Sequence, residues 1–294
     1  MNPKGSIKRV VYMGTPEIAV PPLLGILEAG YEIPLVVSGQ DKRRGRGSRL
    51  APSPVKREAE RLGINVTSDV NDVKAVTADI GVVVAFGKLV PSDVLNHLKM
   101  VNIHFSLLPR WRGAAPLERA ILAGDQTTGV SIMELEETLD TGGVYHSVEI
   151  PIDTDETLKD LQEKCVITGT NALLKCLGEG FGEPIAQKGE ATYAQKITSS
   201  DLEIKWHLPA DEISRVVRIG RAWTTTAKNR LRIHSIRIGH PEVLNAGERS
   251  GVLVGTGDVS IELVKVQPEG RKIMSAQDWV NGLQGKSNGR LGHG

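Results

Sequence analysis

The chain has 294 residues, of which 40% are hydrophobic, 24% are charged and 4% are aromatic, and its net charge at pH 7 is +1. This composition is typical of a soluble globular protein with an aliphatic core. No apolar run approaches the roughly 18 residues of a membrane helix, and the basic lead-in before Val10 is too short for a signal peptide, so we expect no membrane partner. Cys165 and Cys176 are expected to be buried thiols in a reducing cytoplasm.

The first part of the chain alternates strand-like and helix-like segments. Apolar strands are expected at 8–13, 33–37, 79–86 and 100–105, and helices at 16–29, 55–62, from 90 onward and at 116–123. Nearly continuous apolar runs joined by short links are typical of parallel strands. The sequence therefore predicts an α/β fold with a doubly wound, mostly parallel, Rossmann-like sheet whose ligands lie outside the carboxyl ends of the strands. Residues 128–135 and 144–150 are predicted to be antiparallel, followed by a long helix that ends at Gly178.

The C-terminal part of the chain has a different pattern. A helix is expected at 208–220, and strand-like stretches around 230–237, 250–255 and 259–266 are separated by glycine turns. Short strands of this kind predict a small OB-like β-barrel. We expect a catalytic domain at 1–186, a polar linker at 187–206 and the OB-like domain at 207–294, with a capped helix at 275–279 and a frayed end at 285–294.

Charge is distributed unevenly along the chain. Up to Ile204 there are 22 Lys and Arg against 27 Asp and Glu, a balance of −5; from Lys205 onward there are 14 against 8, a balance of +6. Residues 213–241 contain no acidic residue. Such a separation fits a C-terminal domain that contacts a polyanion. A solvated basic face is the alternative that charge alone leaves open.

Asn102 and His104 stand two residues apart on a predicted strand, so their side chains point the same way. An amide and an imidazole can both donate hydrogen bonds to an oxyanion that forms on an attacked carbonyl. Asp140, in a predicted turn, could hold the His104 tautomer and help to move protons. Taken singly, the histidine could be a core residue and the aspartate a turn residue. Together the three predict acyl transfer to an amine without a covalent intermediate.

Missing motifs argue against other classes of chemistry. Gly14-Thr15-Pro16 follows the first strand but lacks the Gly-x-Gly-x-x-Gly pattern, which disfavours NAD. Ser106 lacks a Gly-x-Ser-x-Gly elbow, which argues against a serine hydrolase. No Cys-x-x-Cys or His-x-x-x-His pair occurs, so no metal is expected. The basic, glycine-containing loop at 40–50 is either solvated or ordered around phosphates.

Several stretches closely resemble motifs of the methionyl-tRNA formyltransferase family. They are found at 13–16, 45–47, 52–56, 102–116, 139–142 and 274–278. Their order along nearly the whole chain is more specific than any one of them. The resemblance implies transfer of the formyl group of 10-formyltetrahydrofolate, the co-substrate, to the amino group of methionine on initiator tRNA.

The resemblance also implies roles for individual residues. The catalytic residues that it assigns are Asn102, His104 and Asp140. Those expected to bind the folate are Ser106, Leu107, Leu108, Pro109, Phe86 and Gly87. Those expected to bind tRNA, on the basic loop and the C-terminal domain, are Arg43, Arg44, Arg46, Arg49, Arg218 and Arg221. We expect a cytoplasmic, monomeric enzyme.

The chain departs from the family at two places. Phe86 stands where members commonly carry a tyrosine, so any hydroxyl contact there is absent. Residues 218–224 stand where members often have a proline-rich stretch, which leaves details of tRNA docking open. Two alternatives remain: a formyltransferase that acts on a nucleotide-sugar or purine-ribotide amine, and an RNA-binding module with a decayed site. The basic C-terminal region argues against the first, and the intact trio argues against the second.

Overall fold

The computed structural model of the chain describes residues 7–44, 49–226, 229–240, 244–283 and 288–292. The described residues form two compact units. The first unit is drawn from Met1–Leu117, Thr127–Pro151 and Gln162–Gln195, and the second from Glu118–Gln126, Ile152–Leu161 and Lys196–Gly294. Because the two units interleave along the chain, the domain boundaries expected at 186 and 206 stay predictions. No helix in the described ranges combines the length and the apolar character needed to cross a membrane.

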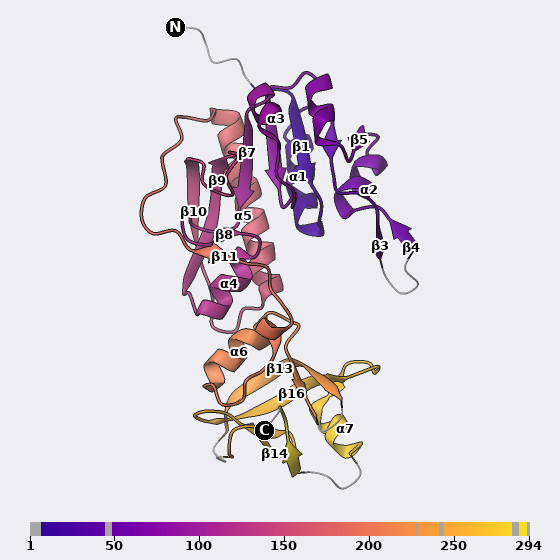
Figure 1. Cartoon of the computed structure of the whole chain (residues 1–294), viewed down its shortest axis with the longest axis vertical. Helices are drawn as coiled ribbons and strands as arrows, with labels where there is room; N and C mark the ends of the chain where they lie inside the picture. The colour runs from indigo at the N-terminus through magenta and orange to yellow at the C-terminus, as the bar shows by residue number, and fades with distance from the viewer. Residues whose placement is uncertain (1–6, 45–48, 227–228, 241–243, 284–287, 293–294) are drawn as a thin grey trace. The chain divides into compact units, whose positions relative to one another are not determined.

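The first unit is built on one seven-stranded sheet (Figure 1). The strand order is β10, β9, β7, β6, β1, β2, β5. The strands that pair in parallel are β1 (Val10–Gly14), β2 (Val36–Val37), β5 (Val66–Thr67), β6 (Ile80–Val84) and β7 (Met100–His104). The antiparallel strands at one edge are β9 (Thr127–Glu134) and β10 (Val144–Pro151). This is the doubly wound, mostly parallel sheet that the sequence predicts.

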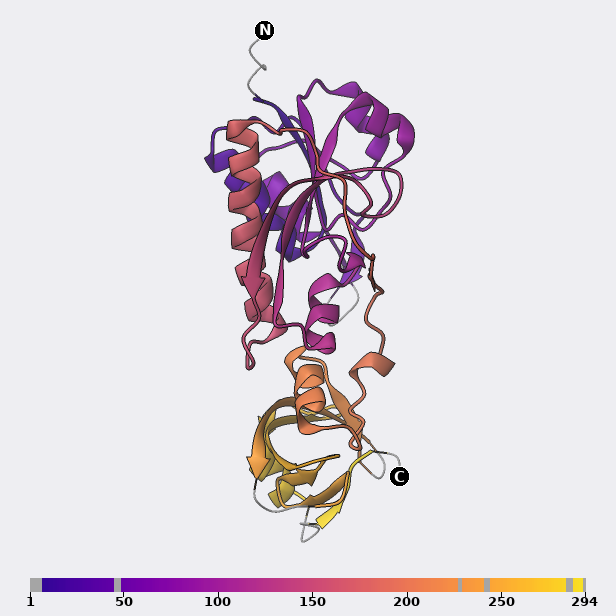
Figure 2. The same cartoon turned by 90° about the vertical axis from the view of Figure 1, so that its left-hand side faces the viewer.

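One face of the sheet is covered by the long helix α5 (Leu158–Glu179), which packs closely against it (Figure 2). Gly169 lies at the contact, opposite Ile103 of β7 and Val130 of β9. α1 (Val20–Glu28) packs beside α5 on this face. A Cβ on Gly25 of α1 would lie 2.7 Å from Thr170 Cγ2 of α5. Two glycines therefore let these helices approach their neighbours without a Cβ between them.

The opposite face is covered by short helical segments. Residues of η2 (Val70–Ala75) and α3 (Ser92–His97) form one apolar cluster with Met13 of β1 and Met100 of β7. Because both faces are buried, the central strands have the nearly continuous apolar sequences that distinguish them from half-exposed strands. The remaining helices in the order of the chain are η1 (Glu17–Ala19), α2 (Pro54–Arg61) and α4 (Pro116–Ala123).

Replacing Gly169 with alanine should destabilise the first unit. The added Cβ would lie 2.8 Å from Ile103 Cγ2 and 3.0 Å from Val130 Cγ1, and overpacking of this kind costs about 1–3 kcal/mol. Gly178, on the same helix, has only Tyr31 Oη nearby, at 4.0 Å. Gly178→Ala should therefore raise the free energy of unfolding by up to about 1 kcal/mol through helix propensity. Urea unfolding measures the change in the free energy of unfolding, which should be negative for Gly169→Ala and positive for Gly178→Ala. Equal changes in the two variants would contradict the packing of α5.

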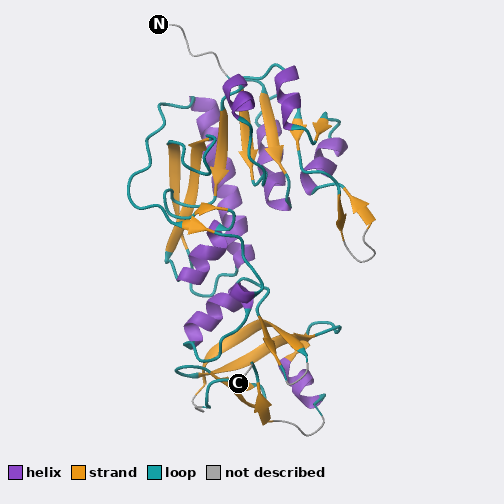
Figure 3. Cartoon of the chain, viewed as in Figure 1, coloured by secondary structure: helices purple, strands orange, loops and turns teal. Residues whose placement is uncertain are grey.

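The second unit is built on an antiparallel sheet, whose strands are drawn in orange in Figure 3. The strand order is β12, β13, β16, β15, β14, β18, with β17 paired to β16. The strands are β12 (Trp223–Thr225), β13 (Arg230–His240), β14 (Glu248–Ser250), β15 (Leu253–Gly255), β16 (Ser260–Pro268), β17 (Met274–Ser275) and β18 (Asn288–Arg290). The sheet curls, since the Gly292 N–H beyond β18 donates to the Thr225 carbonyl of β12 at 2.9 Å. The prediction of a small β-barrel-like domain is confirmed.

The core of this unit contains Trp206, Ile213 of α6 (Ala210–Arg218) and Trp279 of α7 (Ala276–Asn281). α7 begins at a side-chain cap, because the Ser275 hydroxyl accepts the Asp278 N–H at 3.0 Å. The capped helix expected here is therefore confirmed. A short 3-10 helix, η3 (Ser200–Leu202), precedes α6 in the chain.

Several short elements differ from the sequence expectations. The basic loop contains a hairpin of β3 (Lys42–Arg44) and β4 (Arg49–Ala51). Within the expected linker, β11 (Tyr193–Ala194) pairs in parallel with β8 (Arg112–Gly113). β18 lies in the segment expected to be frayed and pairs with β14. Strands of two or three residues carry too little pattern to predict, and partners far away in the chain fix them.

Candidate active site

Asn102 and His104 lie at the carboxyl end of β7, and both are nearly enclosed, at 9% and 5% exposure. Because side chains alternate along a strand, they share the face of Met100, which is the face covered by α3 and η2. Within the described parts of the chain, no hydrogen bond involves the Asn102 side chain. Its amide NH2 is therefore available to a bound molecule.

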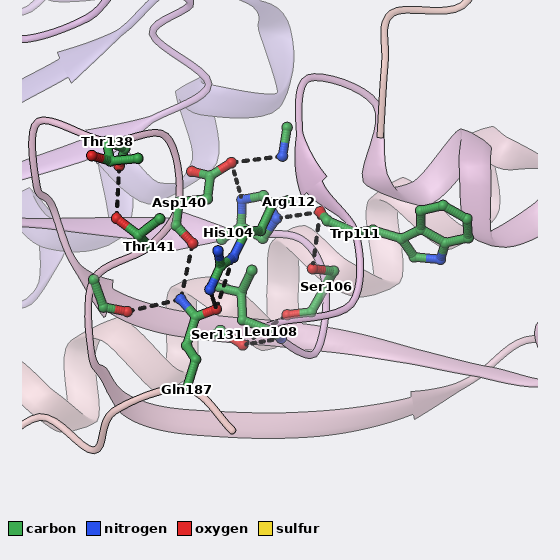
Figure 4. Close-up of polar contacts among 12 residues, drawn as sticks. His104, Ser106, Leu108, Trp111, Arg112, Ser131, Thr138, Asp140, Thr141 and Gln187 are labelled. Carbon is green, nitrogen blue, oxygen red and sulfur yellow. Dashed lines mark hydrogen bonds and ion pairs between the residues drawn. The ribbon is translucent and has the colours of Figure 1, made fainter. Parts of the chain in front are cut away.

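The His104 ring lies between two oxygen atoms (Figure 4). Nε2 is 2.8 Å from the carbonyl oxygen of Trp111. Nδ1 is 3.7 Å from Oδ2 of Asp140, which is 7% exposed. Because a carbonyl oxygen only accepts hydrogen bonds, Nε2 carries a proton and donates it to Trp111. The Nδ1 edge of the ring faces the carboxylate.

Asp140 lies in a turn that is held in an unusual backbone conformation. Its φ of 53° is in the left-handed region, which costs a residue with a side chain about 1–3 kcal/mol. The Gly113 N–H donates to Asp140 Oδ2 at 2.7 Å. Gln187 Nε2 donates to the carbonyl oxygens of Asp140 at 2.9 Å and of Gly142 at 2.8 Å. Contacts from two distant segments therefore hold the carboxylate beside His104.

The loop that begins at Ser106 follows β7 directly and lines the same site. Ser106 is buried, and its hydroxyl lies 3.4 Å from the Trp111 carbonyl oxygen. Ser131 of β9 donates to the Ser106 carbonyl oxygen at 2.7 Å and accepts the Leu108 N–H at 3.3 Å. The three residues after Ser106 are half-buried. The loop is therefore fixed to the sheet by its backbone and keeps apolar side chains partly open.

Phe86 and Gly87 follow β6, the strand beside β7, and lie at the same edge of the sheet. The Phe86 side chain is 5% exposed and packs with Met13 and Val90 in the cluster under α3. Its carbonyl oxygen accepts the Thr15 hydroxyl at 3.2 Å. Gly87 is exposed and has a φ of 75°. The Phe86 ring is therefore part of the core. Gly87 is the exposed residue of the two, at the carboxyl edge of the sheet.

The arginines on the basic loop lie apart from the trio in the chain, on the β3–β4 hairpin. Arg43 and Arg44 are on β3, and Arg49 begins β4. Arg43 is exposed. Arg46, which the family resemblance singles out, lies outside the described residues.

Arg218 and Arg221 lie in the second unit, and their surroundings differ. Arg218 Nε donates to the Glu156 carbonyl oxygen at 2.7 Å, and its Nη2 donates to the Asp153 carbonyl oxygen at 3.0 Å. Burial lowers the pKa of the Arg218 guanidinium. Arg221 is exposed. The Arg218 guanidinium is therefore engaged within its own unit, whereas Arg221 faces solvent.

Known families match both parts of the chain. The sequence model described as "Formyl transferase" matches residues 8–177, and "Formyl transferase, C-terminal domain" matches residues 196–284. A methionyl-tRNA formyltransferase of Corynebacterium diphtheriae is 38% identical and covers 94% of this chain and 97% of its own. One of Jannaschia sp. has the same identity and coverage.

The chain belongs to the methionyl-tRNA formyltransferase family. Solved structures share the fold of this family member. HypX from Aquifex aeolicus, solved with tetrahydrofolic acid, has a TM-score of 0.65 at 14% identity and covers 96% of this chain and 48% of its own. An N-formyltransferase from Helicobacter canadensis, solved with folinic acid and dTDP-3-aminofucose, has a TM-score of 0.65 at 19% identity. It covers 89% of this chain and 99% of its own.

In this methionyl-tRNA formyltransferase family member, sequence reasoning missed two contacts of the trio. The Trp111 carbonyl, which fixes the His104 tautomer, is a backbone group that no side-chain motif reveals. Gln187 lies 47 residues from Asp140 along the chain, in a polar stretch expected to be a linker. In the described ranges, no group of three or more His, Cys, Asp or Glu residues could hold a metal ion.

Proposed function

We propose that this chain transfers the formyl group of 10-formyltetrahydrofolate to the amino group of methionine on initiator tRNA. The observation that carries the proposal is the His104–Asp140 pair beside the free amide of Asn102, at the carboxyl edge of the sheet. Relatives named methionyl-tRNA formyltransferase, 36–39% identical over nearly the whole chain, support the choice of acceptor.

The chemistry requires donors for a developing negative charge and a group that moves a proton. The methionyl nitrogen forms a bond to the formyl carbon, the bond to N10 breaks, and one proton passes from the amine to N10. The Asn102 NH2 donates to the formyl oxygen as charge develops there. Nδ1 of His104, 3.7 Å from the Asp140 carboxylate, takes the proton from the amine and returns it to N10, and the ring is positively charged only while it holds that proton.

The folate is held by the loop after β7 in this proposal. The half-buried residues Leu107, Leu108 and Pro109 offer an apolar edge to a planar heterocycle, while Ser106 is fixed by its contact with the Trp111 carbonyl. Gly87 adds a backbone edge from the neighbouring strand. The folate supplies the formyl carbon, and the loop positions that carbon within reach of Asn102.

The tRNA is contacted in this proposal by exposed basic residues. From the basic loop at 40–50 these are Arg43, with Arg44, Arg46 and Arg49 as further candidates. In the second unit Arg221 is exposed, whereas Arg218 is bound by backbone carbonyls and contributes less. Arg230 stacks 3.7 Å above the Trp223 ring, which adds an exposed guanidinium near β12. Phosphate contacts of this kind depend on charge rather than on base sequence.

The proposal includes a cytoplasmic location and a monomeric state. Cys165 and Cys176 are buried and form no disulfide, as is usual for proteins of a reducing compartment. Charged initiator tRNA is available to translation in the same compartment. Sedimentation of the purified protein measures its oligomeric state directly.

The test is a formylation assay with 10-formyltetrahydrofolate and three amine acceptors: initiator methionyl-tRNA, elongator methionyl-tRNA and a nucleotide-linked amino sugar. We expect kcat/KM for the initiator tRNA to exceed that for the other two by more than about tenfold. Turnover with the amino sugar alone would reassign the acceptor. Binding of tRNA without any formylation would identify an RNA-binding module instead.

A further inference from the structure

The segment 185–194 follows the catalytic sheet in the chain and is bonded to both loops that hold His104. Ile185 forms an isolated bridge with Val144, just after the Asp140 turn. The Thr192 hydroxyl accepts the Trp111 N–H at 3.0 Å, and its carbonyl oxygen accepts the Arg112 N–H at 2.8 Å. We name residues 185–194 the strap. It therefore contacts the loop that carries the Trp111 carbonyl and the turn that carries Asp140.

Gln187 makes the central contacts of the strap, and its side chain uses both ends of the amide (Figure 4). Its Nε2 donates to the carbonyl oxygens of Asp140 and Gly142. Its Oε1 accepts from Arg112 Nε at 3.0 Å and Nη2 at 2.7 Å. Because Oε1 receives two guanidinium N–H groups, the amide can be oriented only with its NH2 toward the Asp140 turn.

The contacts of Gln187 stabilise the left-handed backbone conformation of Asp140. A turn with a φ of 53° at a residue with a side chain persists only where its surroundings hold it. The two carbonyl oxygens bound by Gln187 lie on either side of Thr141, within that turn. Gln187 therefore fixes the backbone from which the Asp140 carboxylate reaches Gly113 N–H and His104 Nδ1.

We propose that Gln187, oriented by Arg112, is a positioning residue of the formyl-transfer site that acts through Asp140 on His104. The inference rests on the proposed function for its catalytic consequence, and its structural part stands on the contacts alone. The Gln187 side chain forms its hydrogen bonds with Arg112 and with the carbonyl oxygens of Asp140 and Gly142, not with the imidazole or the carboxylate. Its effect on the reaction is thus transmitted by the position of the Asp140 turn, and misplacing a reacting group by about 1 Å costs about 10²-fold in rate.

The informative substitution is Gln187→Glu. It keeps the acceptors for Arg112 and removes the donor, leaving a carboxylate opposite two carbonyl oxygens. We expect kcat to fall about 10- to 100-fold with both KM values changed by less than about twofold. Gln187→Met, which has similar length and no donor, is the second variant if the first folds poorly. The matched control is Gln277→Glu, since Gln277 is exposed on α7 and its side chain donates to Asn281 of the same helix.

A double-mutant cycle separates positioning from a general loss of structure. If Gln187 acts through Asp140, Gln187→Glu in an Asp140→Asn background should cost less than about threefold further in kcat. Two losses that multiply in full would overturn the proposal, as would a kcat of the single variant within about twofold of the parent protein.

A readout that needs no turnover keeps the inference distinct from the proposed function. The ring signals of His104, assigned in a nitrogen-15 NMR spectrum by comparison with His104→Ala, should shift in Gln187→Glu and stay in place in Gln277→Glu. This holds whichever amine is the acceptor. Unchanged His104 signals would overturn the positioning role of Gln187 even if the formylation assay succeeds. Shifted signals without formylation would contradict the proposed formyl transfer and leave the positioning role in place.

Discussion

Replacing His104 with alanine is expected to lower kcat for formylation about 10²–10³-fold. The imidazole is the only side chain seen to face both the Trp111 carbonyl and the Asp140 carboxylate among the described residues. Its loss removes the proton acceptor at Nδ1 and the positive charge that the ring gains when it takes the proton. It also removes the shorter of the two hydrogen bonds to the Trp111 carbonyl, leaving that of the Ser106 hydroxyl, at a cost of about 1 kcal/mol in the free energy of unfolding.

The matched control for this change is His97→Ala. His97 is exposed at the end of α3 and outside the site, so its removal should leave kcat unchanged. Single-turnover rates with saturating folate and tRNA measure the chemical step for both variants. Near-full activity of His104→Ala would refute the assigned mechanism, and circular dichroism checks that both variants are folded.

Asp140→Asn is expected to lower kcat about 10²-fold or more with little change in stability. The amide has the shape of the carboxylate, and its oxygen can still accept the Gly113 N–H. The negative charge that faces His104 Nδ1 is lost. Since the Trp111 carbonyl still accepts from Nε2, the histidine keeps its tautomer, and the loss should be smaller than for His104→Ala.

The comparison between single and double variants tests this reasoning. The His104→Ala and Asp140→Asn losses should not multiply, because residues that act as a unit are non-additive. Asp93→Asn is the control, because Asp93 is exposed on α3 and forms an ion pair with Lys74, where the effect on stability should be small. A larger loss from Asp140→Asn than from His104→Ala would show that Asp140 has a role independent of the imidazole.

The regular part of the fold could be predicted because local pattern and burial agree there. The run 80–86 is apolar because helices cover both faces of the sheet. The break in this pattern at Asn102 and His104 marks the site, since two polar side chains on one face of a buried strand have no packing role. Helix α2 was equally predictable, with Ser53 as its cap before Pro54.

Short or strongly charged segments could not be predicted in this way. The η2 segment and the two-residue strands β5, β8 and β11 have no periodicity long enough to read. The residues expected in the folate site and on the tRNA surface followed from resemblance to the family. The structure adds that Phe86 packs in the core and that backbone carbonyls bind Arg218.

The sequence by itself determined the two kinds of sheet, the polar pair on β7 and the family, because each depends on residues that are close together in the chain or on ordered motifs. Only the tertiary structure decided how His104 is oriented. Its partners are a backbone carbonyl, a carboxylate in a left-handed turn and, behind that turn, an amide 47 residues farther along. Such contacts arise from the path of the folded backbone, and no local pattern encodes which distant groups that path brings together.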